Sequence, residues 1–137
     1  MVSSATIYTL PVATDDAFFP GYATNQPMVS SAQSIRNVTL SGTGSTLTTN
    51  AVLTKTGNLT NNGGALAGTG TVALGGSAAQ TIGGTSPTTF PNLTVGSASA
   101  SLGAPASVRQ LVTLNGNLTT NGRAFTLLSD ARAPQWW

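Results

Sequence analysis

The sequence predicts an all-β protein, a right-handed parallel β-helix (β-solenoid) in which short strands stack coil upon coil. Two observations favour this fold class. In residues 66–95, short β-branched runs alternate with polar residues and are separated by Gly pairs and a Pro, which is the period-two pattern of half-buried strands. A triplet of Asn, an apolar residue and Thr also recurs along the chain, which indicates a repeat architecture.

The composition limits the partners of this protein. Only 6% of its 137 residues are charged, against roughly 25% in ordinary globular proteins, so hydroxyl and amide groups must keep the surface polar, as in extracellular β-proteins. The net charge is +2 and the charges are scattered. We predict no nucleic-acid partner, because phosphate binding needs several cations on one face. No segment is apolar over the length of a membrane span, and we predict none.

Three regions follow from the composition along the chain. Residues 1–35 contain the pair Asp15-Asp16 and both tyrosines, and we predict a lead-in or capping segment there. It is expected to contain a turn with a short apolar strand at residues 15–20 and a second strand at residues 25–29. Residues 36–129 are predicted to form the solenoid repeats. Residues 130–137 lack the Gly, Thr and Val of the repeats, and are predicted to be a tail foreign to the protein.

The repeat region contains four copies of the triplet, at residues 37–39, 58–60, 92–94 and 117–119. Their offsets of 21, 34 and 25 residues are of the order expected for one coil. Stacked coils pair their strands about 4.8 Å apart and enclose their apolar side chains, with Asn and Gly at the corners. The predicted inward-facing residues are Leu40, Leu47, Leu59, Val72, Leu74, Ile82, Leu93, Val95, Leu111, Leu114, Leu118 and Leu127.

An antiparallel β-sandwich is the alternative fold. The pairs Asn62-Gly63, Asn115-Gly116 and Asn121-Gly122 have the sequence of two-residue hairpin turns, which reverse the chain direction. The near copies at residues 57–63 and 116–122 favour the repeat, because a solenoid reuses one coil sequence.

Several segments, in this order, resemble a known group of proteins. They are residues 14–29 (TDDAFFPGYATNQPMV), 34–40 (SIRNVTL), 57–63 (GNLTNNG), 89–96 (TFPNLTVG) and 108–131. They are similar to the β-helical segments of large surface proteins that gliding-type Gram-negative bacteria export by type IX secretion. Such proteins are modular and adhesin-like, without an assigned reaction. The resemblance implies a secreted, extracellular or cell-surface location for the parent protein, of which this chain is expected to be a fragment without its export signal.

The residue types that perform most enzymatic chemistry are absent. The chain contains no His, Cys or Glu, so neither a Ser-His-Asp nor a Cys-His arrangement is available, nor a typical zinc site. We therefore predict no catalytic residue, no cofactor and no metal.

The alternative function is a carbohydrate-active module that binds or slowly hydrolyses glycans. Glycosidases use paired carboxylates as acid and base, and the candidates here are Asp15, Asp16 and Asp130. Against this role, neighbouring Asp15 and Asp16 point to opposite sides of a strand or form a turn, and Asp130 lies at the far end of the stack. Lys55, between two threonines, is a weaker candidate for a hydroxyl–lysine pair, and the two C-terminal tryptophans for stacking on a sugar.

We therefore predict a non-catalytic structural or adhesive cell-surface module, either a rigid spacer or a binding face of stacked Thr, Ser and Asn side chains. Surface glycans are its candidate partners. The Thr array also admits ice binding, which the irregular offsets disfavour. Because an open coil leaves backbone groups and apolar side chains unpaired, we also predict a homo-oligomer that associates through the solenoid ends.

Overall fold

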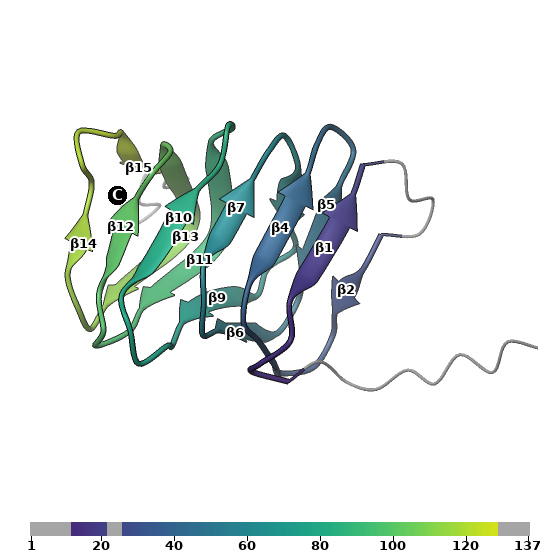
Figure 1. Cartoon of the computed structure of the whole chain (residues 1–137), viewed down its shortest axis with the longest axis horizontal. Coiled ribbons are helices and arrows are strands. Elements are labelled where there is room, and N and C mark those ends of the chain that lie inside the picture. Colours follow the sequence, from purple (N-terminus) through teal and green to yellow (C-terminus); the bar gives the residue numbers. More distant parts are fainter. Residues whose placement is uncertain (1–11, 22–25, 129–137) are drawn as a thin grey trace, which may run out of the picture.

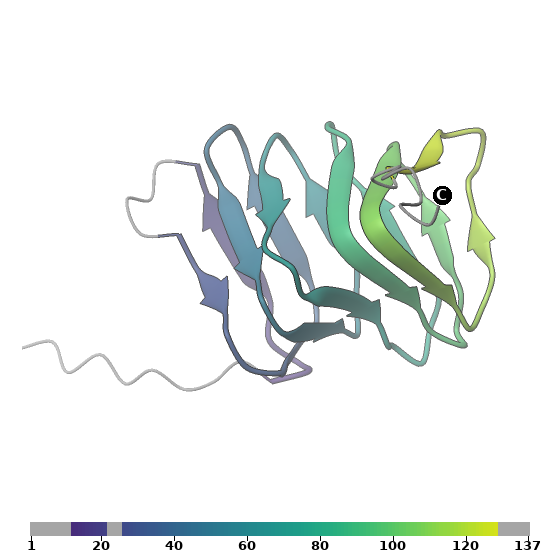
Figure 2. The ribbon, with the colours of Figure 1, turned by 180° about the vertical axis from the view of Figure 1, so that it is seen from behind.

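The computed structural model describes residues 12–21 and 26–128, and within these ranges it contains strands and turns but no helix. The strands stack into a β-solenoid of about 5 turns (Figure 1; Figure 2 shows the opposite side). Every recorded strand pair is parallel. The predicted fold class is thus confirmed, and the antiparallel sandwich is excluded.

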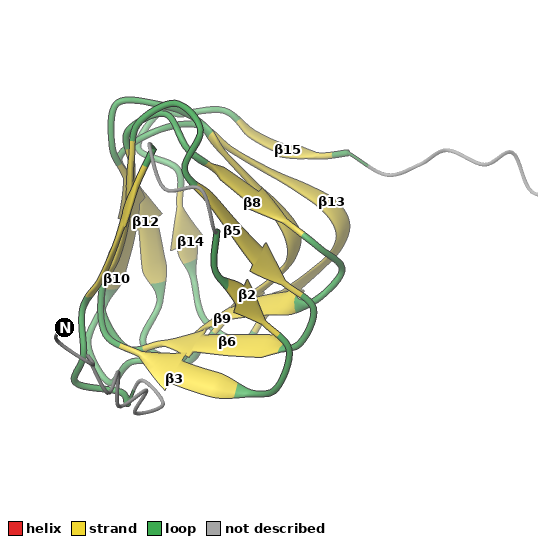
Figure 3. Cartoon of the chain, turned by 90° about the vertical axis from the view of Figure 1, so that its right-hand side faces the viewer, coloured by secondary structure: helices red, strands yellow, loops and turns green. Residues whose placement is uncertain are grey.

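Three parallel sheets form the walls of the solenoid. Sheet A contains β1 (Ala17–Pro20), β4 (Val38–Ser41), β7 (Leu59–Asn61), β10 (Gln80–Gly83), β12 (Ala100–Leu102) and β14 (Leu118–Thr119). Sheet B contains β2 (Met28–Val29), β5 (Thr46–Thr49) and β8 (Ala65–Ala67). Sheet C contains β3 (Gln33–Ile35), β6 (Val52–Lys55), β9 (Thr71–Leu74), β11 (Thr88–Val95), β13 (Ala106–Leu114) and β15 (Phe125–Leu127). Seen from the N-terminal end, each coil runs clockwise away from the viewer, so the solenoid is right-handed (Figure 3).

The coil length explains the uneven spacing of the triplets. Strand register places Val38 beside Leu59, Leu59 beside Ile82 and Ile82 beside Leu102, so successive coils advance by 21, 23 and 20 residues. Three of the triplets lie at the start of the sheet A strands β4, β7 and β14, with the Asn immediately before the strand. The remaining triplet, at residues 92–94, lies within β11 of sheet C. The offsets are irregular because the triplet marks two different walls.

The hairpin-like Asn-Gly pairs are corners that turn the chain from one wall to the next. Gly63 has a φ of +122° between β7 and β8, and Asn121 and Gly122 have φ of +51° and +75° between β14 and β15. Positive φ is tolerated by Gly and by Asn. Gly63, Asn121 and Gly122 therefore adopt the positive φ that a tight turn requires. The strand that follows joins another sheet, however, and does not pair with the preceding strand as it would in a hairpin.

Alternation along the strands fills the interior. In β4, Val38 and Leu40 are buried while Thr39 and Ser41 are half-buried on the outside, and β9 repeats the pattern. The predicted inward-facing residues of the inner coils are buried, namely Leu40, Leu47, Leu59, Val72, Leu74, Ile82, Leu93 and Val95. Phe90, Val108 and further buried residues such as Leu53, Leu66 and Leu102 belong to the same core.

Four predicted core residues near the C-terminal end behave differently. Leu111, Leu114 and Leu127 are 62%, 53% and 52% exposed, and Leu118 is half-buried. Leu114 and Leu127 continue inward columns, since they pair with buried Val95 and Val108. They are exposed because they lie in the last coils of the stack, where the described chain places no further coil over them.

Leu111 is exposed for another reason, because it occupies an outward position of its strand. It lies three residues after buried Val108 in β13, so regular alternation places it on the outer face. It pairs with Asn92, which is half-buried on the outer face, and Val112 pairs with buried Leu93. The pairing shifts next to Pro91, and the phase changes in β11, where Phe90 and Leu93 are both buried although they are three residues apart.

The corner after β7 is held by a buried amide. Asn61 Nδ2 donates to the carbonyls of Gly64 and Pro87 at 3.1 and 2.9 Å, and its Oδ1 accepts from the backbone N–H of Gly63 and Gly64 at 3.1 and 2.8 Å. Three of these hydrogen bonds lie within the turn after β7, and the fourth reaches Pro87 between β10 and β11, so this side chain links two coils.

We expect Asn61→Ala to lower the free energy of unfolding by roughly 1 to 3 kcal/mol, because it removes a buried amide and takes a partner from four part-buried backbone groups. The matched control is Asn62→Ala, since Asn62 is exposed and accepts from the Thr85 N–H at 3.1 Å. Urea unfolding of both variants tests this expectation, and equal losses would contradict it.

The predicted boundary after residue 35 falls between the first and second coils. β1, β2 and β3 pair with β4, β5 and β6 in the three walls, so the region predicted as a cap contributes one strand to each wall. The predicted tail at residues 130–137 lies outside the described residues.

Candidate functional site

The aspartates were the candidate catalytic residues, and Asp16 is firmly engaged. Arg36 Nε and Nη2 donate to its two carboxylate oxygens at 2.7 and 2.8 Å, and the backbone N–H and Nδ2 of Asn37 donate to Oδ1 at 3.2 and 2.9 Å. The hydrogen bond from Arg36, followed by those from Asn37, lowers the pKa of Asp16 to about 2. Asp16 is therefore ionised at neutral pH and cannot serve as a proton donor.

The neighbouring aspartate, Asp15, is engaged in a local turn. Asp15 Oδ2 accepts from the Val12 N–H at 3.0 Å, and the Asp15 N–H donates to the Val12 carbonyl at 2.9 Å, so Asp15 closes a local turn. Asp130 and the two terminal tryptophans lie outside the described residues. Among residues 12–21 and 26–128, no group of three His, Cys, Asp or Glu side chains could hold a metal ion.

Asp16 is instead the first member of a polar ladder along one corner of sheet A. Its Oδ1 accepts from the N–H of Asn37, Asn37 Oδ1 accepts from the N–H of Asn58 at 2.7 Å, and Asn58 Oδ1 accepts from the N–H of Thr81 at 2.8 Å. The Thr81 hydroxyl then lies 3.4 Å from the hydroxyl of Ser101. Side-chain oxygens thus link each coil to the next outside the backbone ladder.

The outer faces of the solenoid carry hydroxyl and amide side chains in rows along the stack. On sheet A the outward positions of successive strands are occupied by Thr39 and Thr60, beside the ladder. On sheet C one outward column contains Ser34, Thr54, Ala73, Thr94 and Thr113. Between residues 38 and 108 the sequence contains a single charged residue, Lys55, and its side chain is 0% exposed. The lateral faces of the inner coils are therefore polar but uncharged.

Lys55 occupies an inward position on sheet C, in the column that contains Ile35, Leu74 and Val95. Its Nζ donates to the carbonyls of Arg36, Gly57 and Asn58 at 3.4, 3.1 and 2.6 Å. All three recorded partners are carbonyls, whereas the neighbouring Thr56 hydroxyl donates to the Ala13 carbonyl at 2.6 Å. The structure therefore does not form the hydroxyl–lysine pair that was considered from sequence.

Burial lowers the pKa of Lys55 to about 7, although the negative charge of Asp16 raises it in part. A second buried polar residue, Gln80, shares this corner: its Nε2 donates to the carbonyls of Lys55 and Gly57 at 2.9 and 2.5 Å, and its Oε1 accepts from the Gly76 N–H at 3.0 Å. Lys55 and Gln80 are thus structural side chains that satisfy backbone carbonyls between coils.

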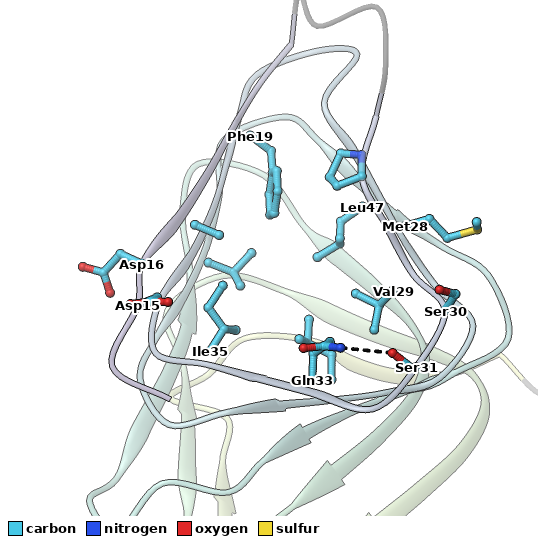
Figure 4. A pocket seen from close by; sticks show the side chains of 14 residues that line it. Asp15, Asp16, Phe19, Met28, Val29, Ser30, Ser31, Gln33, Ile35 and Leu47 are labelled. Atoms are coloured by element: carbon cyan, nitrogen blue, oxygen red, sulfur yellow. Dashed lines mark hydrogen bonds between the residues drawn. The ribbon is translucent and has the colours of Figure 1, made fainter. Parts of the chain in front are cut away.

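A cavity of about 740 Å³ opens at the N-terminal end of the solenoid. Figure 4 shows Phe19, Val29, Ile35 and Leu47 pointing into it, while Asp16 points away from it at the rim. A hydrogen bond of 3.1 Å from Gln33 Nε2 to Ser31 Oγ lies at its edge. The cavity is the open interior of the first coil, and its volume falls in the range of small-molecule pockets.

The fold and these surfaces define the protein as a parallel β-solenoid with uncharged polar faces. A search of family models, curated proteins and solved structures finds no significant match for this chain. The described residues contain no helix that is long and apolar enough to cross a membrane.

Sequence reasoning missed Arg36, Asn61 and Gln80, which hold the corners. A sequence signal does exist for the polar ladder beside them. Asp16, Asn37 and Asn58 are spaced by 21 residues, which is one coil, so the ladder could have been found once the coil length was known. Nothing comparable marks Gln80, because its partners are backbone groups.

Proposed function

We propose that this protein is a non-catalytic structural and adhesive module of a secreted bacterial surface protein, located outside the cell. In this role the solenoid is a stiff spacer, and its flat outer walls bind neutral polar surfaces such as glycans. The resemblance of its segments to type IX secreted adhesin-like proteins supports the location and the role.

The observation that carries this proposal is the absence of exposed charge between residues 38 and 108, where Lys55 is the single charged residue in the sequence and is buried. Hydroxyls and amides are both donors and acceptors, so ranks of Thr, Ser and Asn side chains complement the hydroxyls of a sugar chain. A surface of this kind neither attracts nor repels ions strongly. Binding to it is therefore expected to depend little on salt concentration.

The rigidity of the walls supports the same proposal. The parallel ladders are joined at one corner by the Asp16–Asn37–Asn58–Thr81 hydrogen bonds, so the outward side chains are held in fixed positions. A preordered array loses little conformational freedom on binding, which favours affinity from many weak contacts.

The test removes hydroxyls from one wall and leaves the fold intact. In the triple variant Thr39→Val, Thr60→Val and Thr81→Val, the residues keep a β-branched shape suited to strands. We expect its retention on insoluble cellulose, as a neutral glycan probe, to fall by roughly ten-fold or more, since each lost hydrogen bond contributes about 0.5–1.5 kcal/mol.

The matched control removes three hydroxyls from sheet C, as Thr54→Val, Thr94→Val and Thr113→Val. We expect binding through sheet A to survive this change, and binding of the wild type to be the same at low and high salt. Failure of the wild type to bind neutral glycans would overturn the adhesive role. New reducing ends in the same incubations would overturn the non-catalytic one.

A further inference from the structure

The two ends of the solenoid differ in shape. At the C-terminal end, apolar side chains of inward columns emerge from the stack: Leu114 and Leu127 are 53% and 52% exposed, and Phe125 is partly buried against the core. β15 pairs with Ala106, Ser107 and Val108 of β13. In the described chain no strand pairs with the outer edge of the later part of β13, which ends at Leu114.

The N-terminal end contains a cavity, whereas apolar side chains emerge at the C-terminal end. The cavity of about 740 Å³ is lined by apolar side chains from all three walls, including Phe19 of β1, Val29 of β2 and Ile35 of β3. These three strands are also the edges of sheets A, B and C, so their outer backbone N–H and C=O groups face no further strand in the described chain. Such an edge is a template for pairing with another chain.

We propose that the C-terminal end of one copy of this chain docks into the N-terminal cavity of a second copy, so that the solenoid continues head to tail from molecule to molecule. Leu114 and Leu127 of one copy enter the cavity of the next, where Leu114 continues the inward column that begins at Ile35. Strands at the two ends of each wall run in the same direction, so β1 and β3 can extend sheets A and C of the neighbour with the parallel pairing found inside the molecule.

Three features favour this head-to-tail contact over contacts between like ends. Two like ends related by a two-fold axis bring their strands together antiparallel. Such a contact also places one cavity against another, or the exposed leucines of one C-terminal end against those of another, so the shapes do not complement each other. Charge acts in the same direction: the N-terminal end carries Asp15, Asp16 and Arg36, a balance of one negative charge, whereas the turn between β14 and β15 carries Arg123. A heterologous contact of this kind does not close, and it therefore produces chains of molecules.

The test uses one variant for each end. Val29→Arg places a cation in the cavity and leaves the C-terminal end intact, and Leu114→Arg does the converse. Light scattering of the wild type should show a mass that grows with concentration beyond a dimer. Each variant alone should remain monomeric, with association weakened more than about ten-fold by the desolvated charge. In an equimolar mixture, the intact C-terminal end of Val29→Arg can dock into the intact cavity of Leu114→Arg. The two remaining ends of this heterodimer are blocked, so association should stop at the dimer.

Thr94→Arg is the matched control, since it adds the same charge to a lateral wall, and it should associate like the wild type. If Val29→Arg fails to fold by circular dichroism, Phe19→Arg blocks the same cavity from sheet A. A wild type that stays monomeric at high concentration would overturn the proposal, as would a dimer of either variant alone, which indicates contact between like ends. This inference is independent of the adhesive function, because it is measured without glycan.

Discussion

Between pH 7 and pH 10.5 the free energy of unfolding of the wild type should rise by several kcal/mol, and the variant Lys55→Met should not show this rise. The cause is the buried ammonium group of Lys55, whose pKa burial lowers from 10.5 to about 7. Each unit by which folding changes a pKa corresponds to roughly 1.4 kcal/mol.

The sign follows from the protons bound in each state. In this pH window the unfolded chain carries a proton on Lys55 that the folded chain has released, so raising the pH favours the folded state. Below about pH 7 both states are protonated, and stability stays at its lower level. Above about pH 10.5 both states are neutral, and the rise ends.

Lys55→Met should also be at least as stable as the wild type below pH 7. Each carbonyl that Nζ contacts keeps another donor: the Gly57 N–H donates to Arg36 at 2.8 Å, Gln80 Nε2 to Gly57 at 2.5 Å, and the Val38 N–H to Asn58 at 3.0 Å. Removing Lys55 therefore orphans none of them. Methionine has a similar length and fits apolar surroundings, and replacing a buried charge by a well-packed apolar group is often neutral or stabilising.

Urea unfolding midpoints from pH 6 to pH 11 measure both effects. The comparison is clean because the chain contains no His or Cys, and Lys55 is its single lysine. Tyrosines and the terminal amine titrate in both proteins, so their contribution cancels in the difference. A Lys55→Met variant that keeps the full rise would show that the pH dependence has another origin.

The sequence predicted the walls of the solenoid well because alternation is a local property. Val38, Thr39 and Leu40 show in three residues which side of the strand faces inward. The prediction for Leu111 was wrong because Leu111 and Leu114 are three residues apart and cannot both face inward on a regularly alternating strand. Pairing with buried Phe90 and Val95 places Val108 and Leu114 on the inner side, which leaves Leu111 on the outer one.

The buried polar residues were harder to predict than the core. Lys55 lies in a column of Ile35, Leu74 and Val95, and only the register reveals that a lysine occupies an inward position. The aspartate pair was visible in the sequence, but its electrostatic state depends on Arg36, one coil away. Coil length and register are therefore the two quantities that the sequence pattern lacked.

Leu93→Ala should destabilise the protein by about 2–5 kcal/mol, the cost of a cavity left by a fully buried leucine. Leu93 is 0% exposed and pairs with Val72 on one side and Val112 on the other, so its side chain is covered from neighbouring coils. The middle of the stack cannot relax as freely as an end, because strands on both sides hold the backbone.

Leu111→Ala is the matched control, since it makes the same substitution on the adjacent strand, at a position that is 62% exposed. It should change the free energy of unfolding by no more than about 0.5 kcal/mol. The two leucines differ in the side of the strand that they occupy and not in their chemistry, so the difference between the variants measures the inward and outward assignment directly. Equal losses in urea unfolding at low protein concentration would mean that β13 has a different register, with Leu111 inside the stack.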